Sequence, residues 1–415
     1  MKSEPQPSIE SQATGLWLVG ARGAISTTLA YGLGALQRGW IPPTGLLTAT
    51  PALESIGWVP WDRWHLGGHD VCLRDLSASA QELVQAHILP PGWPAALADW
   101  GSQYEQAIRP GLLDGAGEGL EGLDPASVTL SQRTPREQIA QLQADWNQFE
   151  AERGLATTVI VCLASTEAKQ LARPEWDVLE QLDASLDRGE PQPASLLYAY
   201  AALDSGRAFV NFTPNLGSRP PALHQLAELR GVPHCGNDGK TGETLLKTAL
   251  APMFHARALR VLAWQGYNML GNRDGAVLRQ EGHREAKLAN KDEALRSILT
   301  QPGSQPNPDL HSHVAIDFVP SLGDWKTAWD FVHFEGFLGT RMSLQFTWAG
   351  SDSVLAAPLV LDLARLAELA LRRGESGVLA HTACFFKAPL AGGTHDFHRQ
   401  YQILLDYLGG VVPPS

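Results

Sequence analysis

The sequence predicts an α/β fold in which a Rossmann-type dinucleotide-binding domain carries an inserted α+β domain. Three observations support this prediction. A short apolar run at 16–19 leads through a glycine turn into a helical pattern. Later apolar runs also end in small polar residues, as strands of a doubly wound sheet do. After residue 245 the strand-like runs, such as 313–319 and 342–348, have longer and irregular connections, which indicates a second sheet.

Composition narrows the class of protein. The chain has 415 residues, 44% of them hydrophobic, which is enough for two sizeable cores. The net charge of −12 argues against nucleic acid or an anionic membrane as a partner, so an anionic ligand requires a local basic pocket. The four cysteines are far apart, the polar N-terminus has no apolar signal core, and the apolar helical stretch 354–371 contains charges. We therefore expect a soluble cytoplasmic protein with reduced thiols.

The glycine turn follows a lead-in, residues 1–14, that we expect to be flexible. It reads Gly20-Ala21-Arg22-Gly23-Ala24-Ile25, a place where a helix N-terminus meets a pyrophosphate in dinucleotide-binding proteins. The pattern is G-x-x-G-x-x-S, which departs from G-x-G-x-x-G, so it is weak evidence when taken alone. Two placements of Arg22 stay open, along the pyrophosphate or toward solvent.

The next segment, 39–68, is rich in Pro, Trp and Gly, and we expect a long loop. Asp70 lies fifty positions after Gly20, whereas the usual ribose carboxylate comes about 20 residues on, so spacing alone does not select it. His65 and His69 are four positions apart. With no third ligand nearby, an ordinary histidine pair is favoured over a metal site.

Two further predicted strands end in polar residues. An amphipathic helix at 138–153 precedes a β-branched strand at 157–163, which ends in Ala164-Ser165-Thr166. A helix at 194–202 precedes the strand 208–212, which ends in Thr213-Pro214-Asn215. Open parallel sheets bind ligands at such carboxyl ends. The plainer interpretation, that Ser165 or Thr166 caps a following helix, stays open.

The segment 236–244 allows three interpretations. A nucleotide P-loop is rejected, because His234 stands where its first glycine belongs. A turn capped by Thr241 is the plain interpretation. The third is a phosphate seat, in which backbone N–H groups and a hydroxyl gather at a helix N-terminus. A second polar, glycine-flanked segment at 266–275 favours the phosphate seat.

These segments resemble the myo-inositol-phosphate synthase family. Gly236 to Thr244 resembles the family's GDD-x-K-S-G-Q-T, and Gly266 to Gly275 resembles its SYNHLGNNDG. Asn211 to Asn215 resembles the start of its NGSPQNTF. The resemblance extends in order from the glycine turn to Lys387. It implies an NAD-dependent enzyme, an inositol-3-phosphate synthase that acts on glucose 6-phosphate and forms a homotetramer.

The resemblance also implies a domain layout and a set of site residues. Residues 15–244 and 354–415 correspond to the NAD-binding domain, and 245–353 to an inserted catalytic and tetramerisation domain. The implied catalytic residues are Lys287, Lys291, Lys326, Lys387 and Asp238. The implied cofactor-binding residues are Gly20, Arg22, Gly23, Ala24, Ile25, Asp70, Ala164, Thr166, Thr213, Asp238, Asp274, Asp352 and Ser353. The implied substrate-binding residues are Lys240, Thr241, Gly242, Thr244, Asn268, Leu270 and Asn272.

The plain interpretations of these residues remain beside the functional ones. Lys287 and Lys291 are four apart near Glu285 and Asp292, a pattern typical of a solvated helix face. Asp238 and the polar residues Asn268, Asn272 and Asp274 are of the types that commonly form turns. Lys326 and Lys387 lie in apolar and aromatic surroundings, where a lysine needs a reason.

The implied reaction oxidises C5 of open-chain glucose 6-phosphate, forms an enolate at C6, closes the ring on C1 and reduces C5 again. Negative charge develops on O5 and then on O1, so fixed cations are required. We expect Lys326 and Lys287 to transfer protons at O5 and O1, and Lys291 and Lys387 to stabilise charge or bind phosphate. Mutual repulsion among the lysines is expected to lower their pKa values.

Some residues depart from the family's pattern. Glu243 replaces Gln, Met269 replaces His, Arg273 replaces Asn and Asn237 replaces Asp. A carboxylate at Glu243 repels a phosphate unless it turns away or pairs with a lysine. No metal ligand is assigned, and the residues leave open no metal, a monovalent cation or a divalent one. Two other functions stay open: an NAD enzyme for another sugar phosphate, by cyclisation or plain oxidation, and a non-catalytic NAD-binding regulator.

Overall fold

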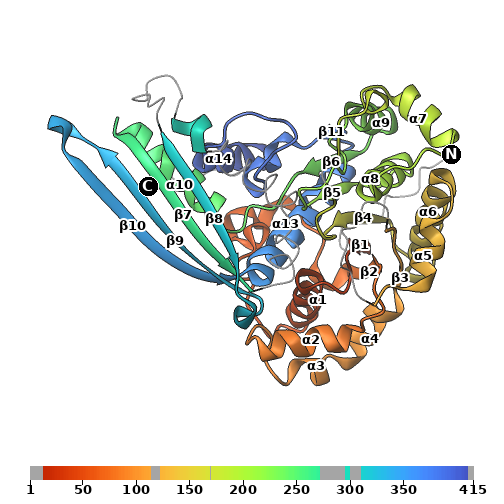
Figure 1. Ribbon diagram of the computed structural model, residues 1–415. Helices are drawn as coiled ribbons and strands as arrows, with labels where there is room; N and C mark the ends of the chain where they lie inside the picture. The colour runs from red at the N-terminus through yellow and green to blue at the C-terminus, as the bar shows by residue number, and fades with distance from the viewer. Residues whose placement is uncertain (1–12, 114–121, 169, 272–294, 300–309, 410–415) are drawn as a thin grey trace.

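The computed structural model describes residues 13–113, 122–168, 170–271, 295–299 and 310–409. It contains a seven-stranded parallel sheet with helices on both faces and a separate four-stranded mixed sheet that projects to one side (Figure 1). The predicted fold class, a Rossmann-type α/β domain with an additional α+β unit, is confirmed. Within the described residues, no helix is long and apolar enough to cross a membrane.

The strand order of the parallel sheet is β11-β6-β5-β4-β1-β2-β3. Six of these strands form the order 3-2-1-4-5-6 of dinucleotide-binding sheets, in which the order reverses beside β1 and leaves a crevice at the carboxyl ends. The strands are β1 Thr14–Val19, β2 Trp64–Asp70, β3 Ile108–Pro110, β4 Thr157–Cys162, β5 Phe209–Asn211, β6 Pro233–Gly236 and β11 Gly377–Val378.

Alternation along β1 builds the two cores. Leu16 and Leu18 join one hydrophobic cluster, whereas Trp17 and Val19 join the other. The first cluster lies under α1 (Ala24–Gln37) and α13 (Asp352–Arg372). The second lies under α6 (Pro135–Arg153), α8 (Ala194–Asp204) and α9 (Pro221–Arg230). Successive side chains of a strand point to opposite faces of the sheet. Because both faces of this sheet are covered by helices, apolar residues are needed at every position, which explains the uninterrupted apolar strands.

The other helices connect these strands or cover the sheet edges. The predicted helices at 138–153 and 194–202 are confirmed as parts of α6 and α8. The remaining bounds are α2 Leu76–Gln85, α3 Trp93–Ala96, α4 Ala98–Gln106, α5 Pro125–Ser131, α6 Pro135–Arg153, α7 Leu179–Asp187, α8 Ala194–Asp204, α9 Pro221–Arg230, α10 Glu243–Ala256 and α14 Phe397–Tyr407.

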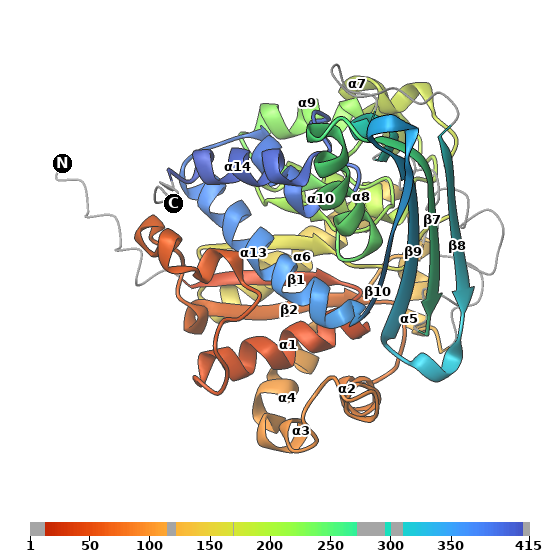
Figure 2. The ribbon, with the colours of Figure 1, turned by 90° about the vertical axis from the view of Figure 1, so that its left-hand side faces the viewer.

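The second sheet has the order β10-β9-β7-β8, with strands β7 Arg260–Leu270, β8 His311–Phe318, β9 Trp325–Glu335 and β10 Arg341–Ser351. Strands β7 and β8 are parallel, and the other neighbours are antiparallel. Figure 2 shows α10 on one side of this sheet, where Phe254 packs edge-on against Trp264 at 6.1 Å. Strand β10 runs directly into α13, so the second sheet returns the chain to the parallel sheet without a linker.

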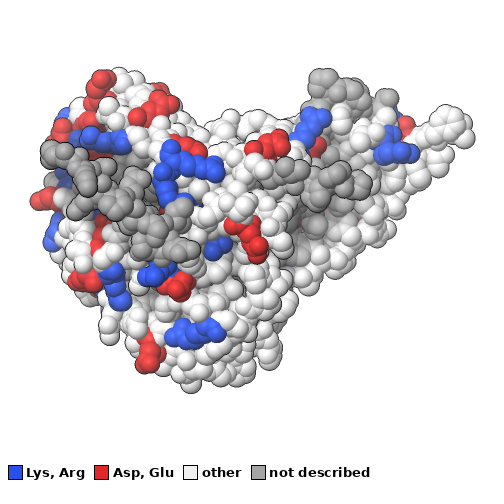
Figure 3. Space-filling model, turned by 180° about the vertical axis from the view of Figure 1, so that it is seen from behind, with Lys and Arg blue, Asp and Glu red and all other residues white. Residues whose placement is uncertain are grey.

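Charged side chains are mixed over the part of the molecule that contains the parallel sheet. On the face seen in Figure 3, acidic and basic side chains alternate, and the described residues there form no continuous basic surface. This distribution agrees with the expectation, drawn from the net charge of −12, of a local anion site rather than a broad basic one.

The expected long loop at 39–68 is wrong in its last part, because β2 begins at Trp64 and lies beside β1. The sequence of this strand, with two glycines and two histidines, has little strand character. The glycines are required by close packing. A Cβ on Gly67 would lie 2.6 Å from the Trp17 ring, and one on Gly68 would lie 2.4 Å from the Leu18 carbonyl oxygen.

We expect Gly68→Ala to lower the free energy of unfolding by about 2 kcal/mol, because the added methyl overlaps backbone that has no room to move. Gly32→Ala is the matched control. Gly32 lies within α1 and has open space around it, so alanine there raises stability by about 0.5–1 kcal/mol through helix propensity. Chemical unfolding followed by tryptophan fluorescence measures both, and equal stability of the two variants would contradict the packing argument.

Candidate active site

The turn after β1 leaves the N-terminus of α1 open. Gly20 has φ +92°, and a Cβ there would lie 3.0 Å from the Leu163 carbonyl oxygen, so glycine is required. No side chain caps α1, no acidic residue occupies its first turn, and Gly23 and Ala24 are exposed. The buried Ser26 hydroxyl donates to the Gly20 carbonyl at 2.7 Å and fixes the turn. These features fit a pyrophosphate bound by free N–H groups.

Asp70 ends β2 directly beside this turn. Its carboxylate accepts from the Arg22 backbone N–H at 2.7 Å and from the Cys72 N–H at 3.0 Å. The wide spacing from Gly20 arises because the 39–63 segment, with three short 3-10 helices, lies between α1 and β2. The fold therefore brings Asp70 to the strand end where dinucleotide sites carry their ribose carboxylate.

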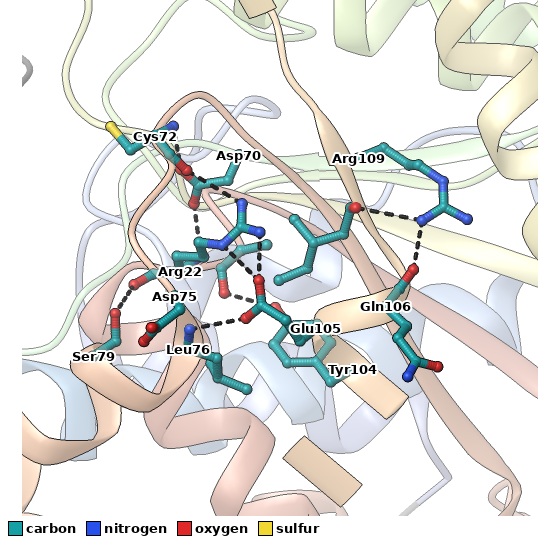
Figure 4. Close-up of polar contacts among 12 residues, drawn as sticks. Arg22, Asp70, Cys72, Asp75, Leu76, Ser79, Tyr104, Glu105, Gln106 and Arg109 are labelled. Carbon is teal, nitrogen blue, oxygen red and sulfur yellow. Dashed lines mark hydrogen bonds and ion pairs between the residues drawn. The ribbon is translucent and has the colours of Figure 1, made fainter. Parts of the chain in front are cut away.

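The side chains of Arg22 and His69, near the glycine turn, both have partners within the protein. The Arg22 guanidinium does not point to solvent, because it pairs with Glu105 of α4 (Figure 4). His69 is fully buried, where it accepts from the Trp17 indole at 2.9 Å and lies 3.1 Å from an Asp145 oxygen. Burial lowers the pKa of His69, although Asp145 opposes this. Its role is to satisfy polar groups within the core.

Polar residues after β4 and β5 form one network. Asn215 accepts from the Glu167 N–H at 2.8 Å and donates to the Ser165 carbonyl at 3.0 Å. Asn211 accepts from the Thr213 hydroxyl at 2.7 Å. No described helix begins directly after Thr166, so the interpretation of Ser165 or Thr166 as a helix cap is wrong. The network instead fixes the loops that hold Ala164, Thr166 and Thr213 at the carboxyl edge.

The loop after β6 meets the segment after α13. The Lys387 ammonium donates to Asp238 Oδ1 at 2.7 Å, and the Lys387 N–H donates to the Asp238 carbonyl at 2.7 Å. The loop and the first turn of α10 also contain three buried oxygens with no hydrogen-bond partner among the described residues: Asn237 Oδ1, Asp238 Oδ2 and Thr244 Oγ1. Buried polar atoms normally have partners, so this concentration indicates a ligand site.

Lys326 joins the second sheet to this loop. Its ammonium contacts Asp352 Oδ1 at the start of α13 and lies 3.4 Å from the Thr241 hydroxyl oxygen. The Thr241 hydroxyl donates to the same carboxylate at 3.3 Å. A Cβ on Gly242 would lie 2.8 Å from the Lys326 ammonium, so this close approach depends on glycine. Three predicted residues from distant parts of the chain thus meet.

Lys240 has a different environment. Its side chain is 2% exposed, and its ammonium donates to Gln400 Oε1 on α14 at 2.7 Å. The ammonium also lies 5.7 Å from the Phe397 ring centre. Burial lowers the pKa of Lys240 to about 8. The Lys240 ammonium thus lies against α14 and not beside the Thr241 hydroxyl.

The Glu243 carboxylate pairs with a lysine. This pairing reduces the repulsion that a carboxylate beside a phosphate would otherwise cause. Glu243 Oε1 lies 2.7 Å from the Lys247 ammonium, and both side chains are almost fully buried. Asn268 on β7 donates to the other oxygen at 2.8 Å. Lys247 was not among the residues predicted for the site, although its position four residues after Glu243 was a visible signal.

The alternation of β7 separates the residues of the 266–275 segment. Asn268 and Leu270 lie on the face toward α10, whereas Tyr267 and Met269 lie on the other face, each 40% exposed. Met269 therefore points away from Glu243. Asn272, Arg273, Asp274, Lys287 and Lys291 lie outside the described residues. Ser353 is buried and donates to Asp324 at 2.6 Å.

The two described catalytic lysines, Lys326 and Lys387, each contact a carboxylate rather than another lysine. The expected repulsion between lysines is therefore absent from the immediate contacts of this pair. Among the described residues, no group of three or more His, Cys, Asp or Glu side chains has the arrangement of a metal site.

Comparisons with known proteins agree with this geometry. Residues 14–408 match the family described as myo-inositol-1-phosphate synthase. An inositol-3-phosphate synthase 1 of Bacteroides thetaiotaomicron is 31% identical, over 96% of this chain and 93% of that protein. The rice inositol-3-phosphate synthase 1 is 33% identical over 68% of this chain, but the match spans only 54% of the rice protein. The crystal structure of an inositol-3-phosphate synthase from Caenorhabditis elegans has a TM-score of 0.84, with 23% identity over 96% of this chain and 86% of that one, a likeness of fold.

We expect Glu243→Gln to lower the free energy of unfolding by about 3 kcal/mol, because it removes the carboxylate from the buried Lys247 ammonium. Adding Lys247→Met removes the stranded charge and restores part of the loss. Thermal and chemical unfolding measure both variants.

The control is Glu335→Gln at the end of β9. Glu335 pairs with Arg260 at 2.9 Å, but the two side chains are 22% and 42% exposed, so we expect a change within about 1 kcal/mol. If the control costs as much as Glu243→Gln, burial is not the source of the effect.

Proposed function

This chain belongs to the myo-inositol-1-phosphate synthase family, and we propose that it converts glucose 6-phosphate to 1D-myo-inositol 3-phosphate with NAD as cofactor. The observation that carries the proposal is the meeting of Lys326, Thr241 and Asp352 beside a loop with unpartnered buried oxygens. Two lysines held by carboxylates, a threonine hydroxyl and an open helix N-terminus suit a phosphorylated sugar whose oxygens become anionic.

NAD is held across the carboxyl edge of the parallel sheet in this proposal. The N–H groups of Ala24 and Ile25 bind the pyrophosphate at a turn that Gly20 and Gly23 shape, and Asp70 faces the adenosine ribose. Ala164, Thr166 and Thr213 bind the nicotinamide half, together with Asp352 and Ser353 at the start of α13. When bound, the nicotinamide supplies oxidation at C5 and the later reduction of that carbon.

The phosphate of the sugar sits at the N-terminus of α10. The Thr241 hydroxyl and the N–H groups that begin the helix bind its oxygens, and the Glu243–Lys247 pair keeps the nearby carboxylate from repelling it. Asn268, held by Glu243, orients sugar hydroxyls.

The lysines manage charge on the sugar. We assign proton transfer at O5 to Lys326, because Asp352 and Thr241 fix its ammonium beside the phosphate seat. Lys387, fixed by Asp238, stabilises negative charge that develops during ring closure. Lys287 and Lys291 complete the proposed set.

The assay that tests the function incubates the protein with NAD⁺ and glucose 6-phosphate, identifies phosphorylated products by NMR and follows NADH absorbance. We expect an inositol monophosphate with no net NADH. Lys326→Met is expected to lower kcat by about 10³-fold, because it removes the charge and proton at O5.

The dissociation constant of NAD⁺ is the second readout. Lys326 contacts Asp352 of the nicotinamide half, but the pyrophosphate and ribose contacts at the glycine turn remain, so we expect Lys326→Met to change this constant by less than about tenfold, far less than kcat. Net NADH accumulation would instead indicate a dehydrogenase. NAD⁺ binding without any product would indicate a regulator, and either result would overturn the proposed reaction.

The homotetramer and the cytoplasmic location are part of the same proposal. The face of the second sheet opposite α10 carries Tyr267 stacked on Trp329 at 5.5 Å, with Met269 and Trp325 close to 40% exposed. In Figure 1 this face is turned to the viewer, and no described helix crosses it. An aromatic face of this kind suits burial against a second copy. None of the four cysteines forms a disulfide, which agrees with a reducing compartment.

We expect Trp329→Glu to convert the tetramer into smaller species in sedimentation velocity, because a charge on this face opposes its burial. Leu171→Glu is the control. Leu171 is 83% exposed on another part of the chain, and its replacement is expected to leave the sedimentation coefficient unchanged. A wild-type monomer, or a Trp329→Glu variant that stays tetrameric, would contradict the proposed interface.

A further inference from the structure

A cluster of charged side chains surrounds the end of β2, next to the glycine turn. Figure 4 shows Asp70, Arg22 and Glu105 gathered there from β2, the turn and α4. Each forms a hydrogen bond or ion pair with the turn or with its neighbours, so the cluster is fixed by the chain itself.

All three nitrogens of the Arg22 guanidinium are engaged. Nε and Nη2 donate to Glu105 Oε1 at 3.1 and 2.5 Å, and Nη1 donates to the Cys72 carbonyl at 3.2 Å. The Arg22 side chain is 17% exposed. Charge-assisted bonds of this kind are among the stronger hydrogen bonds in proteins, so the guanidinium is held toward α4.

Glu105 is itself anchored by backbone. Its second oxygen accepts from the Leu76 N–H at the start of α2, at 2.8 Å. The adjacent Tyr104 hydroxyl donates to the Ala21 carbonyl at 2.8 Å, and the Ser79 hydroxyl donates to the Arg22 carbonyl at 2.9 Å. Helices α2 and α4 thus hold both members of the Arg22–Glu105 pair in place.

In dinucleotide-binding sheets, the residues at the end of the second strand decide between NAD and NADP. A carboxylate there binds the ribose 2′-hydroxyl of NAD, whereas an arginine nearby accommodates the 2′-phosphate of NADP. The chain has both residue types, in Asp70 and Arg22. Asp70 accepts one backbone N–H on each oxygen, which leaves lone pairs for ribose hydroxyls. Each nitrogen of the Arg22 guanidinium already donates one hydrogen bond, and the Glu105 carboxylate neutralises its positive charge, so the guanidinium is turned toward α4.

We propose that Glu105 sets the preference for NAD⁺ over NADP⁺ by holding the Arg22 guanidinium away from a 2′-phosphate. The Asp70 carboxylate beside the pair also repels a 2′-phosphate. This inference rests on the proposed function, since it requires that a dinucleotide bind at the glycine turn.

The test is Glu105→Gln, with the dissociation constants of NAD⁺ and NADP⁺ measured by titration calorimetry at low ionic strength. Glutamine keeps an acceptor for the Leu76 N–H but removes the charge that holds Arg22. We expect the dissociation constant of NADP⁺ to fall about tenfold, as gain of one charge-assisted contact implies, and that of NAD⁺ to change by less than about threefold.

Two further variants isolate the mechanism. Arg22→Gln combined with Glu105→Gln should lose most of the gain for NADP⁺, because the guanidinium supplies it. Glu82→Gln is the matched control. Glu82 forms a comparable pair with Arg74, also at 2.5 Å, but on the exposed side of α2, so its loss should leave both dissociation constants unchanged.

The outcomes are distinct. Wild-type protein that binds neither dinucleotide would overturn the proposed function and this inference with it. Wild-type protein that binds NAD⁺, with an unchanged preference in Glu105→Gln, would overturn this inference alone. An equal loss of affinity for both cofactors in Glu105→Gln would also overturn it, because Glu105 would then act only as a support for the turn. If Glu105→Gln fails to fold, Glu105→Asp, which shortens the reach to Arg22, should shift the preference in the same direction.

Discussion

The contact between Lys326 and Asp352 is the interaction on which the site depends, because it joins the two sheets. Lys326 belongs to β9 of the second sheet, and Asp352 begins the helix that returns the chain to the parallel sheet. Asp324 reinforces the same junction, since its buried carboxylate accepts from the Ser353 hydroxyl at 2.6 Å. Burial raises the pKa of Asp324, and the serine hydrogen bonds oppose the rise. The second sheet is thereby fixed against the loop that we propose as the phosphate seat.

The parts of the fold that follow from local pattern were predictable from the sequence. The apolar strands at 157–162 and 209–211 and their polar ends depend on neighbours within a few residues, and the structure confirms them. Strand β2 was missed because its glycines are dictated by Trp17 and Leu18 on the adjacent strand, which local propensity does not contain. The meeting of Lys326, Thr241 and Asp352 was predictable only as a set of site residues, because its geometry needs both sheets.

Side-chain direction was the least predictable property. Lys240 is next to Thr241 in the sequence, yet its ammonium contacts Gln400, 160 positions away, and not the groups around Thr241. Arg22 pairs with Glu105 across 83 positions. Long flexible side chains choose among partners by tertiary proximity, and a sequence motif does not record that proximity. Glu243 is the exception, because its partner four residues on shares its helix face.

Charge pairing explains how a chain with a net charge of −12 can hold the proposed site for two anionic ligands. Lys326, Lys387 and Lys247 each contact a carboxylate, so their positions are set before a ligand arrives. Preorganised cations of this kind avoid the entropy that free lysine side chains lose on binding. Pairing also reduces their net attraction, and the open N-termini of α1 and α10 then supply much of the local pull on phosphate groups. The same reasoning applies to Arg22, whose charge is cancelled where a 2′-phosphate would need it. Paired charges therefore allow the two helix N-termini to select phosphates by position, where a broadly basic surface would bind any polyanion.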